Sequence, residues 1–282
     1  MNLGRFSIEL LSTGTFALDG GAMFGVVPKN LWSRVYHPGD EQNRIPMCAP
    51  SLLVRFDDRV CLIDTGNGTK WTEKLATMYK INNDDHTLVT SLAQYGLTPA
   101  DITDVILTHL HFDHAGGATT LENGVPVPMF PRATYHVQKD HLAHALKPYD
   151  KDRASFMREN FEPLIANGMM HAIDGDGTLF PGITLQCMHG HTTALQTVLI
   201  DGGETKIFFA ADLFPTSAHL AIPYVMAYDN QPLVSIAEKK AILPRAVDEQ
   251  WKIVFGHDGF IQASTVIAGE KGFVRGEDIR IS

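Results

Sequence analysis

The stretch THLHFDHAGG at positions 108–117 constrains this chain more than any other feature, because it holds three histidines and an aspartate within six residues. It directly follows the apolar run 105–107, which predicts a buried strand that ends near Thr108. The residues after that strand are expected to form a loop in which the first two histidines point the same way. The residues of interest in this loop are His109, His111, Asp113 and His114.

Metal binding is the chemistry that this crowding favours. Imidazole nitrogens and carboxylate oxygens are the ligands that borderline-soft divalent ions such as zinc accept. A single histidine is more often a surface residue or a satisfied core residue, but four ligand types so close together favour a metal loop. Gly116 and Gly117 would let the backbone pass close to the site, before a helical turn that is expected to begin at Ala118.

The composition narrows the classes of protein that can carry such a loop. A chain of 282 residues with 44% hydrophobic content can bury a sizeable core, and its net charge of -9 disfavours nucleic acid as a partner. The first twenty residues do not read as a signal peptide, and no apolar run is long enough to span a bilayer. We therefore expect a cytoplasmic protein with no membrane partner. The widely spaced Cys48, Cys61 and Cys187 favour reduced thiols over disulfides or cysteine-bound zinc.

Hydrophobic patterning predicts strands that alternate with helices. The expected strands are 51–56, 60–63, 105–108, 133–137, 183–188, 197–200, 207–211 and 251–255. The expected helices are 70–79, 87–95, 139–146, 151–161 and 232–243, with a short turn at 98–99. Turn residues at 57–58 and 201–203 favour antiparallel hairpins, so mixed sheets covered by helices are the expected outcome.

Three further metal-ligand residues stand at the ends of buried-looking strands, where side chains from different strands can converge on one rim of a sheet. They are His191, Asp212 and His257. Burial of an unpaired carboxylate behind an apolar strand is costly, and a metal ion would remove that cost at Asp212. A helix cap or turn role for Asp212, and a structural role for His257, remain open alternatives.

Taken together, these pieces resemble the metallo-β-lactamase superfamily over most of the chain. The matching pieces are LIDTG at 62–66, THLHFDH at 108–114, GHT at 190–192, AD at 211–212 and GHD at 256–258. The resemblance implies an α/β (α+β) fold, a four-layer αββα sandwich with the site along one edge of the sheets. It also implies a single hydrolase domain over 1–282, with an amino-terminal extension at about 1–45 and an insertion at about 138–170.

The resemblance further implies a dinuclear metal site. One ion would be held by His109, His111 and His191, the other by Asp113, His114 and His257, and Asp212 would bridge them. Zinc is the expected metal for both ions, with iron, manganese and cobalt as open alternatives. His189 stands where relatives often have proline and is taken as a non-ligand.

Two aspartates are expected to have catalytic tasks. Asp113 would pass a proton to the leaving group. Asp64 lies in Asp-Thr-Gly after an apolar strand, a pattern that is also a common turn. The family resemblance favours a role behind the ligands, in which Asp64 accepts the outer N–H of a ligand histidine and fixes its tautomer.

A bridging hydroxide at such a site would hydrolyse an ester-like bond of a small molecule. The segment MFGVVPKNLW at 23–32 and the insertion resemble quorum-quenching lactonases, whose substrates include N-acyl-homoserine lactones. Met23, Phe24 and Trp32 would then line the substrate pocket, or alternatively form core or a contact in a homodimer. The nearest tyrosines after Asp212 are Tyr224 and Tyr228, because Pro215 and Thr216 stand where some lactonases carry a substrate-binding tyrosine.

Other chemistries remain open on the sequence alone. A phosphotriester, ester or thioester could replace the lactone as the substrate of the same fold. An iron-dependent dioxygenase shares part of the ligand set, although retention of His114 and His257 favours two metals. A flavodiiron protein would need a flavin domain, for which the chain has no room. A metal-stabilised binding protein would be expected to have lost some ligands.

Overall fold

Two compact units make up the computed structural model, which describes residues 1–84, 86–270 and 272–281. The first unit contains residues 1–16 and 48–175, and the second contains 17–47 and 176–281. The single-domain organisation therefore stays a prediction. None of the helices in the described ranges is long and apolar enough to cross a membrane.

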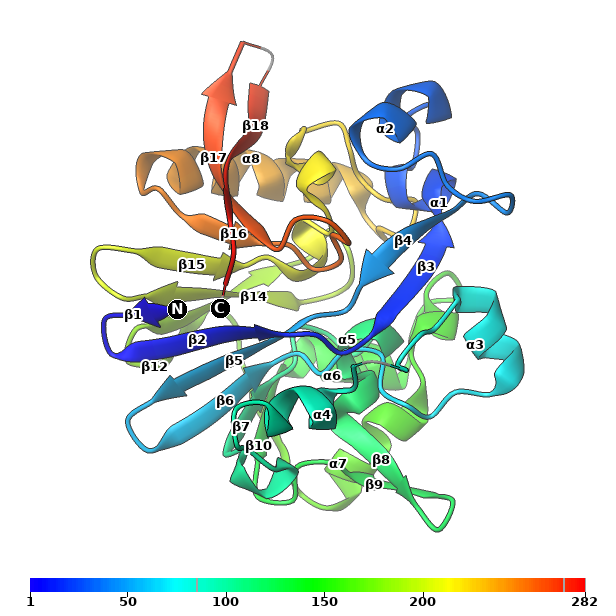
Figure 1. Cartoon of the computed structure of the whole chain (residues 1–282), viewed down its shortest axis with the longest axis vertical. Coiled ribbons are helices and arrows are strands. Elements are labelled where there is room, and N and C mark those ends of the chain that lie inside the picture. The colour runs from blue at the N-terminus through cyan, green and yellow to red at the C-terminus, as the bar shows by residue number, and fades with distance from the viewer. Residues whose placement is uncertain (85, 271, 282) are drawn as a thin grey trace. The chain divides into compact units, whose positions relative to one another are not determined.

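A seven-stranded sheet forms the centre of the first unit, in the order β1-β2-β5-β6-β7-β10-β11. The strands β1, β2, β5 and β6 pair antiparallel, whereas β6, β7, β10 and β11 run parallel. Figure 1 shows the blue and cyan strands β2, β5 and β6 side by side. The strand bounds are β1 Asn2–Leu3, β2 Phe6–Leu11, β5 Ser51–Phe56, β6 Arg59–Ile63, β7 Asp104–Ile106, β10 Thr134–Gln138 and β11 Met170–Ile173.

Helices cover one face of this sheet and close a hydrophobic core. Leu62 and Val105 of the sheet belong to one buried cluster with Leu92 of α4 and Ala145 of α6. A reciprocal capping box between Thr87 and Thr90 fixes the start of α4. The helical elements are α3 Glu73–Tyr79, α4 Leu88–Ala93, η1 Pro99–Asp101, α5 Phe112–Ala115, η2 Gly116–Ala118, α6 Lys139–Leu146, η3 Arg153–Ser155, η4 Arg158–Asn160 and α7 Glu162–Ala166. A hairpin of β8 Thr119–Glu122 and β9 Val125–Pro128 completes the unit.

The second unit is built on another seven-stranded sheet, in the order β12-β13-β14-β15-β16-β17-β18. Its strands pair antiparallel except for β15 and β16, which run parallel. The long helix α8 Pro232–Asp248 contacts β17. The strand bounds are β12 Gly177–Phe180, β13 Ile183–Met188, β14 Leu195–Asp201, β15 Lys206–Phe209, β16 Lys252–Val254, β17 Ala263–Gly269 and β18 Gly272–Ile279.

Shorter elements surround this sheet. Asp19 caps α1, because its side chain accepts a hydrogen bond of 2.7 Å from the amide of Ala22. The short elements are α1 Gly20–Phe24, α2 Lys29–Val35, η5 Ala211–Leu213 and η6 Ser217–Leu220, with a two-stranded sheet of β3 Thr15–Asp19 and β4 Arg44–Cys48.

The predicted mixed α/β architecture with two large sheets and covering helices is confirmed. Each of the eight expected strands exists, with ends shifted by at most two residues, and both expected hairpins are antiparallel. The strands that were not predicted are β1, β2, β3, β4, β8, β9, β11, β12, β17 and β18.

Three helical predictions were wrong in detail. Residues 151–161 form two short 3-10 turns instead of one helix. A helical turn was expected to begin at Ala118. Instead, the helical elements α5 and η2 come before that position, η2 ends at Ala118, and β8 follows. The last helix continues through Pro244 to Asp248. The N–H that proline lacks would have bonded to the carbonyl of Lys240, and Lys240 is an exposed residue.

Candidate metal centre

Four predicted ligands of the first unit lie in and just before α5, immediately after β7. The His109 imidazole lies 4.5 Å from the His111 ring and 4.0 Å from the His114 ring, measured between centroids. Their burial removes the side chains from bulk water: His109 is 0% exposed, His111 6%, Asp113 8% and His114 2%. The loop therefore brings three imidazoles together at the carboxyl end of a buried strand.

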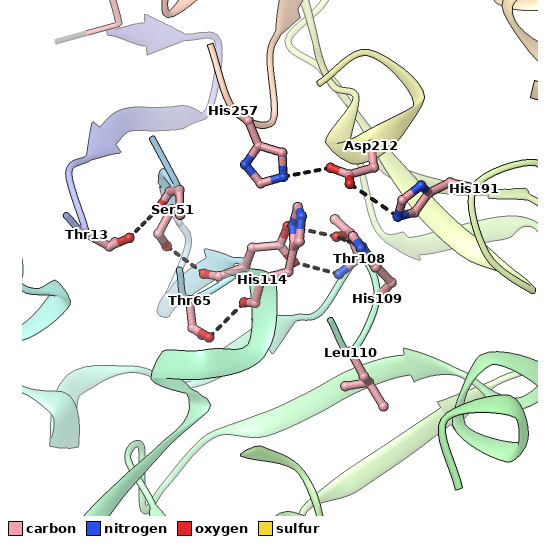
Figure 2. A network of polar contacts seen from close by, with 12 residues as sticks. Thr13, Ser51, Thr65, Thr108, His109, Leu110, His114, His191, Asp212 and His257 are labelled. Carbon is pink, nitrogen blue, oxygen red and sulfur yellow. Dashed lines mark hydrogen bonds and ion pairs between the residues drawn. The ribbon is translucent and has the colours of Figure 1, made fainter. Parts of the chain in front are cut away.

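Asp64 anchors this loop from the end of β6. One of its carboxylate oxygens accepts a hydrogen bond of 2.7 Å from the amide of Thr108. The other oxygen lies 2.7 Å from the Thr108 hydroxyl and 2.8 Å from Nδ1 of His114 (Figure 2 labels Thr108 and His114). Asp64 adopts a left-handed backbone, with φ of 57°, which aspartate tolerates better than most residues.

These contacts set which ring nitrogens are available to a metal. A carboxylate can only accept, so His114 donates Nδ1–H to Asp64 and keeps its lone pair on Nε2. The Thr108 hydroxyl also donates to Asp64, so its oxygen accepts from Nδ1–H of His109, 3.1 Å away. Both histidines therefore present Nε2 as the electron-pair donor that a metal ion needs.

Backbone packing holds the loop against the segment that follows Asp64. The carbonyl of His114 accepts hydrogen bonds from the Thr65 amide, at 2.7 Å, and from the Thr65 hydroxyl, at 2.9 Å. A Cβ on Gly116 would lie 2.1 Å from the carbonyl oxygen of Asn67, and one on Gly117 would lie 2.3 Å from that of Thr65. The two glycines are needed because no side chain fits between these backbones.

The predicted insertion supports the loop from its other side. The amide of Leu110 donates to Nε2 of His141 on α6, at 2.8 Å. The Phe156 ring lies 4.6 Å from the His111 ring, and the same ring contacts His144, which pairs with a buried aspartate, Asp152. These contacts could not be predicted from the sequence, because α6 and the turns after it carry no recognisable motif.

The predicted ligands of the second unit come from three separate strands. His191 follows β13, Asp212 lies in η5 after β15, and His257 follows β16. In Figure 2 the Asp212 carboxylate lies between the two imidazoles. One oxygen is 2.9 Å from Nε2 of His257, and the other is 3.2 Å from Nε2 of His191. Each carboxylate oxygen therefore faces one imidazole, in a cluster that is buried.

Asp229 is a functional candidate that the sequence did not reveal. Its carboxylate lies 3.0 Å from Nδ1 of His191 and is 4% exposed. Because the carboxylate accepts Nδ1–H, Nε2 of His191 keeps its lone pair, in the same way as Asp64 acts on His114. The residue stands in a loop as Asp-Asn before the start of α8, where the sequence reads as an ordinary turn.

Comparison with known proteins identifies the family. A family model described as the metallo-beta-lactamase superfamily matches residues 49–257, which is most of the chain. The chain belongs to the metallo-β-lactamase superfamily. The stretch matched begins just before β5 and ends at His257, so it includes every predicted ligand.

Proteins similar to this chain include a lactonase and a probable metal-dependent hydrolase. An N-acyl homoserine lactonase from Bacillus sp is 28% identical over 73% of this chain and 79% of its own length. A probable metal-dependent hydrolase from Staphylococcus aureus has a similar structure, with a TM-score of 0.89, 31% identity and coverage of 99% of this chain and 100% of that one. The chain is thus a hydrolytic enzyme.

A third relative shares the fold. The structure of AidC, a dizinc quorum-quenching lactonase in complex with a product, matches with a TM-score of 0.80 and 22% identity, over 100% of this chain and 97% of that one. At this identity the similarity concerns the fold alone.

The residues present fit the divalent metal that membership of the metallo-β-lactamase superfamily implies. The histidines and aspartates of both sets offer the ligand atoms that a metal ion accepts, and all of them are buried. In three of the imidazoles, those of His109, His114 and His191, Nδ1 contacts Thr108, Asp64 or Asp229. Nε2 is thereby left to donate its electron pair to a metal ion. Such outer contacts are typical of metal-binding histidines.

The remaining candidates of the sequence analysis lie outside these clusters. His189 is exposed, and its Nδ1 accepts a hydrogen bond from the amide of Ala194. Phe24 stacks on Trp32, with centroids 5.2 Å apart, and is buried together with Met23. Met23, Phe24 and Trp32 therefore belong to the core of the second unit. On the sequence alone, this role was left open as the alternative to a pocket wall.

His219 joins this aromatic core and gives it a pH dependence. Burial, followed by the nearby charge of Lys239, lowers the pKa of His219 to about 4. In the unfolded chain the pKa is about 6.5. Between these values only the unfolded state binds the proton. The contribution of His219 to the free energy of unfolding is therefore fully present above pH 6.5. It falls by about 1.4 kcal/mol per pH unit as the pH drops toward 4.

Denaturant unfolding of the wild type and of His219→Gln at pH 7 and pH 5 tests this dependence. The loss of stability on acidification should be smaller in His219→Gln than in the wild type. The matched control is His189→Gln, which alters an exposed histidine of the same unit and should behave like the wild type. Equal losses in all three proteins would contradict the prediction.

Proposed function

We propose that this chain is a dinuclear metallohydrolase that opens a lactone, with N-acyl-homoserine lactones as the substrate class. The observation that carries the metallohydrolase assignment is the set of buried histidines and aspartates whose donor nitrogens are oriented by Thr108, Asp64 and Asp229. The lactone assignment is supported by the similarity to an N-acyl homoserine lactonase over 73% of the chain.

The proposed ligand sets divide seven side chains between two ions. One ion takes His109, His111 and His191; the other takes Asp113, His114 and His257. Asp212 bridges them, a role supported by its two oxygens, each of which faces a different imidazole. Seven ligands exceed what a single tetrahedral ion can use, and zinc accepts all of these donor types.

The protein's own residues divide the catalytic work. When bound, two divalent ions supply a hydroxide nucleophile near neutral pH and polarise the attacked carbonyl. Asp64 and Asp229 hold two ligand imidazoles in the correct tautomer. Asp113 passes a proton to the ring oxygen as it leaves, which completes the hydrolysis of the ester bond.

A substrate panel tests the lactone assignment. We expect kcat/KM for N-acyl-homoserine lactones to exceed that for aryl phosphotriesters, thioesters and β-lactams, and to vary with the length of the acyl tail. All rates should be measured on the same metal-loaded preparation. Turnover of a phosphotriester well above every lactone would overturn the substrate class while leaving the metal assignment intact.

Asp229→Asn tests the support of His191. An amide can still occupy the space, but it no longer offers a charged acceptor to Nδ1–H, so metal affinity should fall about 10- to 100-fold. Asp64→Ala should weaken the binding of metal to a similar degree, through His114. Competition with a metal chelator measures both affinities. Asp248→Asn, at an exposed carboxylate in the same unit as Asp229, should keep the wild-type affinity; an equal loss there would contradict the assignment.

A further inference from the structure

Two histidines on neighbouring strands of the first unit face each other outside the candidate metal centre. His136 of β10 and His171 of β11 are direct partners in the parallel register. Their Nδ1 atoms lie 3.0 Å apart, and the ring planes are inclined by 83°. His136 is buried, with 5% of its surface exposed, whereas His171 is exposed. One member of the pair is thus held inside the protein, and the other is an exposed residue.

Asp104 fixes the orientation of the buried member. Its carboxylate is 2% exposed and lies 2.8 Å from Nε2 of His136. Burial alone would raise the pKa of Asp104, but hydrogen bonds from His136, Thr103 and Arg59 outweigh it and lower that pKa below its usual value. The group is therefore a carboxylate that accepts Nε2–H, so the lone pair of the neutral ring lies on Nδ1 and points toward His171.

We propose that His136 and His171 hold a further divalent cation of the zinc, copper and nickel class through their Nδ1 atoms. Two imidazole nitrogens bound to one zinc ion at a tetrahedral angle lie about 3.3 Å apart, close to the spacing already present. The carboxylate–histidine–metal arrangement that Asp104 would complete is the usual support of such ligands. Water or a small external ligand fills the remaining positions.

Binding requires one proton to move. At 3.0 Å the two Nδ1 atoms share a hydrogen bond, so one of them carries a hydrogen. When the cation forms bonds to both lone pairs, that hydrogen leaves Nδ1. If the pair is neutral, Nε2 of the exposed His171 takes up the proton through water, and no net proton is released; if the pair is protonated, one proton goes to solvent.

The pair is separate from the proposed catalytic ligands. Asp104 begins β7, whereas the ligand loop follows the other end of the same strand. None of His136, His171 and Asp104 belongs to the catalytic set. The cation proposed here is therefore additional to the two catalytic ions, and its loss should leave basal turnover unchanged.

Zinc uptake by the holoenzyme provides the test. Equilibrium dialysis against increasing Zn²⁺ should show one equivalent beyond the metal already present in the wild type, and this equivalent should be absent from His171→Gln. The matched control is His86→Gln, at another exposed histidine of the same unit, which should bind as the wild type does. Uptake by His171→Gln equal to that of the wild type, or no extra uptake by the wild type, would overturn the proposal.

Two further readouts keep the test independent of folding and of the catalytic assignment. Asp104→Asn leaves both ligands in place, and its affinity for the extra Zn²⁺ should fall about 10- to 100-fold; unchanged affinity would contradict the role of the carboxylate. Without added Zn²⁺, His171→Gln should hydrolyse its substrate at the wild-type rate. A failure of the lactone assignment would thus leave the dialysis result standing.

Discussion

Asp212→Ala is expected to lower kcat/KM about 10³-fold, which corresponds to about 4 kcal/mol of transition-state stabilisation, and to lower the metal content at the same time. The reason is the position of the carboxylate between two imidazoles, 2.9 Å from Nε2 of His257 and 3.2 Å from that of His191. A bridging carboxylate serves two cations, so its removal costs each of them a ligand and leaves their mutual repulsion less compensated.

Elemental analysis and steady-state kinetics on the same preparation measure both effects. The matched control is Asp201→Ala, which removes an exposed carboxylate from the same unit and should retain both metal and activity. Circular dichroism shows whether the Asp212→Ala protein is folded. A folded variant with two metal ions and normal turnover would show that Asp212 does not bridge.

Complete removal of metal should have an even larger effect on turnover. Chelation is expected to reduce turnover to the uncatalysed level and to lower the free energy of unfolding, because an ion that binds only the folded state stabilises it by about 4 kcal/mol when its free concentration is 1,000 times its Kd. When the cation leaves, the buried imidazoles and carboxylates of the site lose favourable interactions that solvent does not replace.

Return of metal provides the stoichiometry. Added Zn²⁺ should restore turnover and saturate at about two tightly held ions per chain, whereas Mg²⁺, which prefers oxygen ligands, should restore little. The additional uptake proposed for His136 and His171 is excluded by carrying out the titration in His171→Gln. Saturation at a single ion with full activity would defeat the dinuclear assignment.

The parts of the site that could be predicted from sequence are those whose signal is local. Four donors within six residues after an apolar run mark the loop that begins with His109, and the apolar strands before His191 and His257 place these residues at strand ends. A buried strand and a group of metal-ligand residues are each marked by a few neighbouring residues, so they can be recognised in a single sequence.

Contacts that depend on tertiary packing left no such signal. Asp229 reaches His191 across 38 positions of sequence, and Phe156 lies against His111 from a segment that was predicted as a helix. That segment contains two 3-10 turns. Its propensity favoured a helix, but the buried Phe156 and the Asp152 contact with His144 fix another path.

The close approach of backbone to backbone beside the ligand loop has a consequence for evolution and engineering. Gly68, Gly116 and Gly117 leave no room for a side chain, since a Cβ on Gly68 would lie 2.2 Å from the carbonyl oxygen of Gly116. Libraries that aim at new substrates should therefore hold these three codons constant, leave Asp152 and Phe156 unchanged, and place their diversity in segments that supply no metal ligand, such as residues 147–151. Activity on new substrates would then arise from changes in one segment of the first unit, while the positions of its metal-ligand atoms stay unchanged.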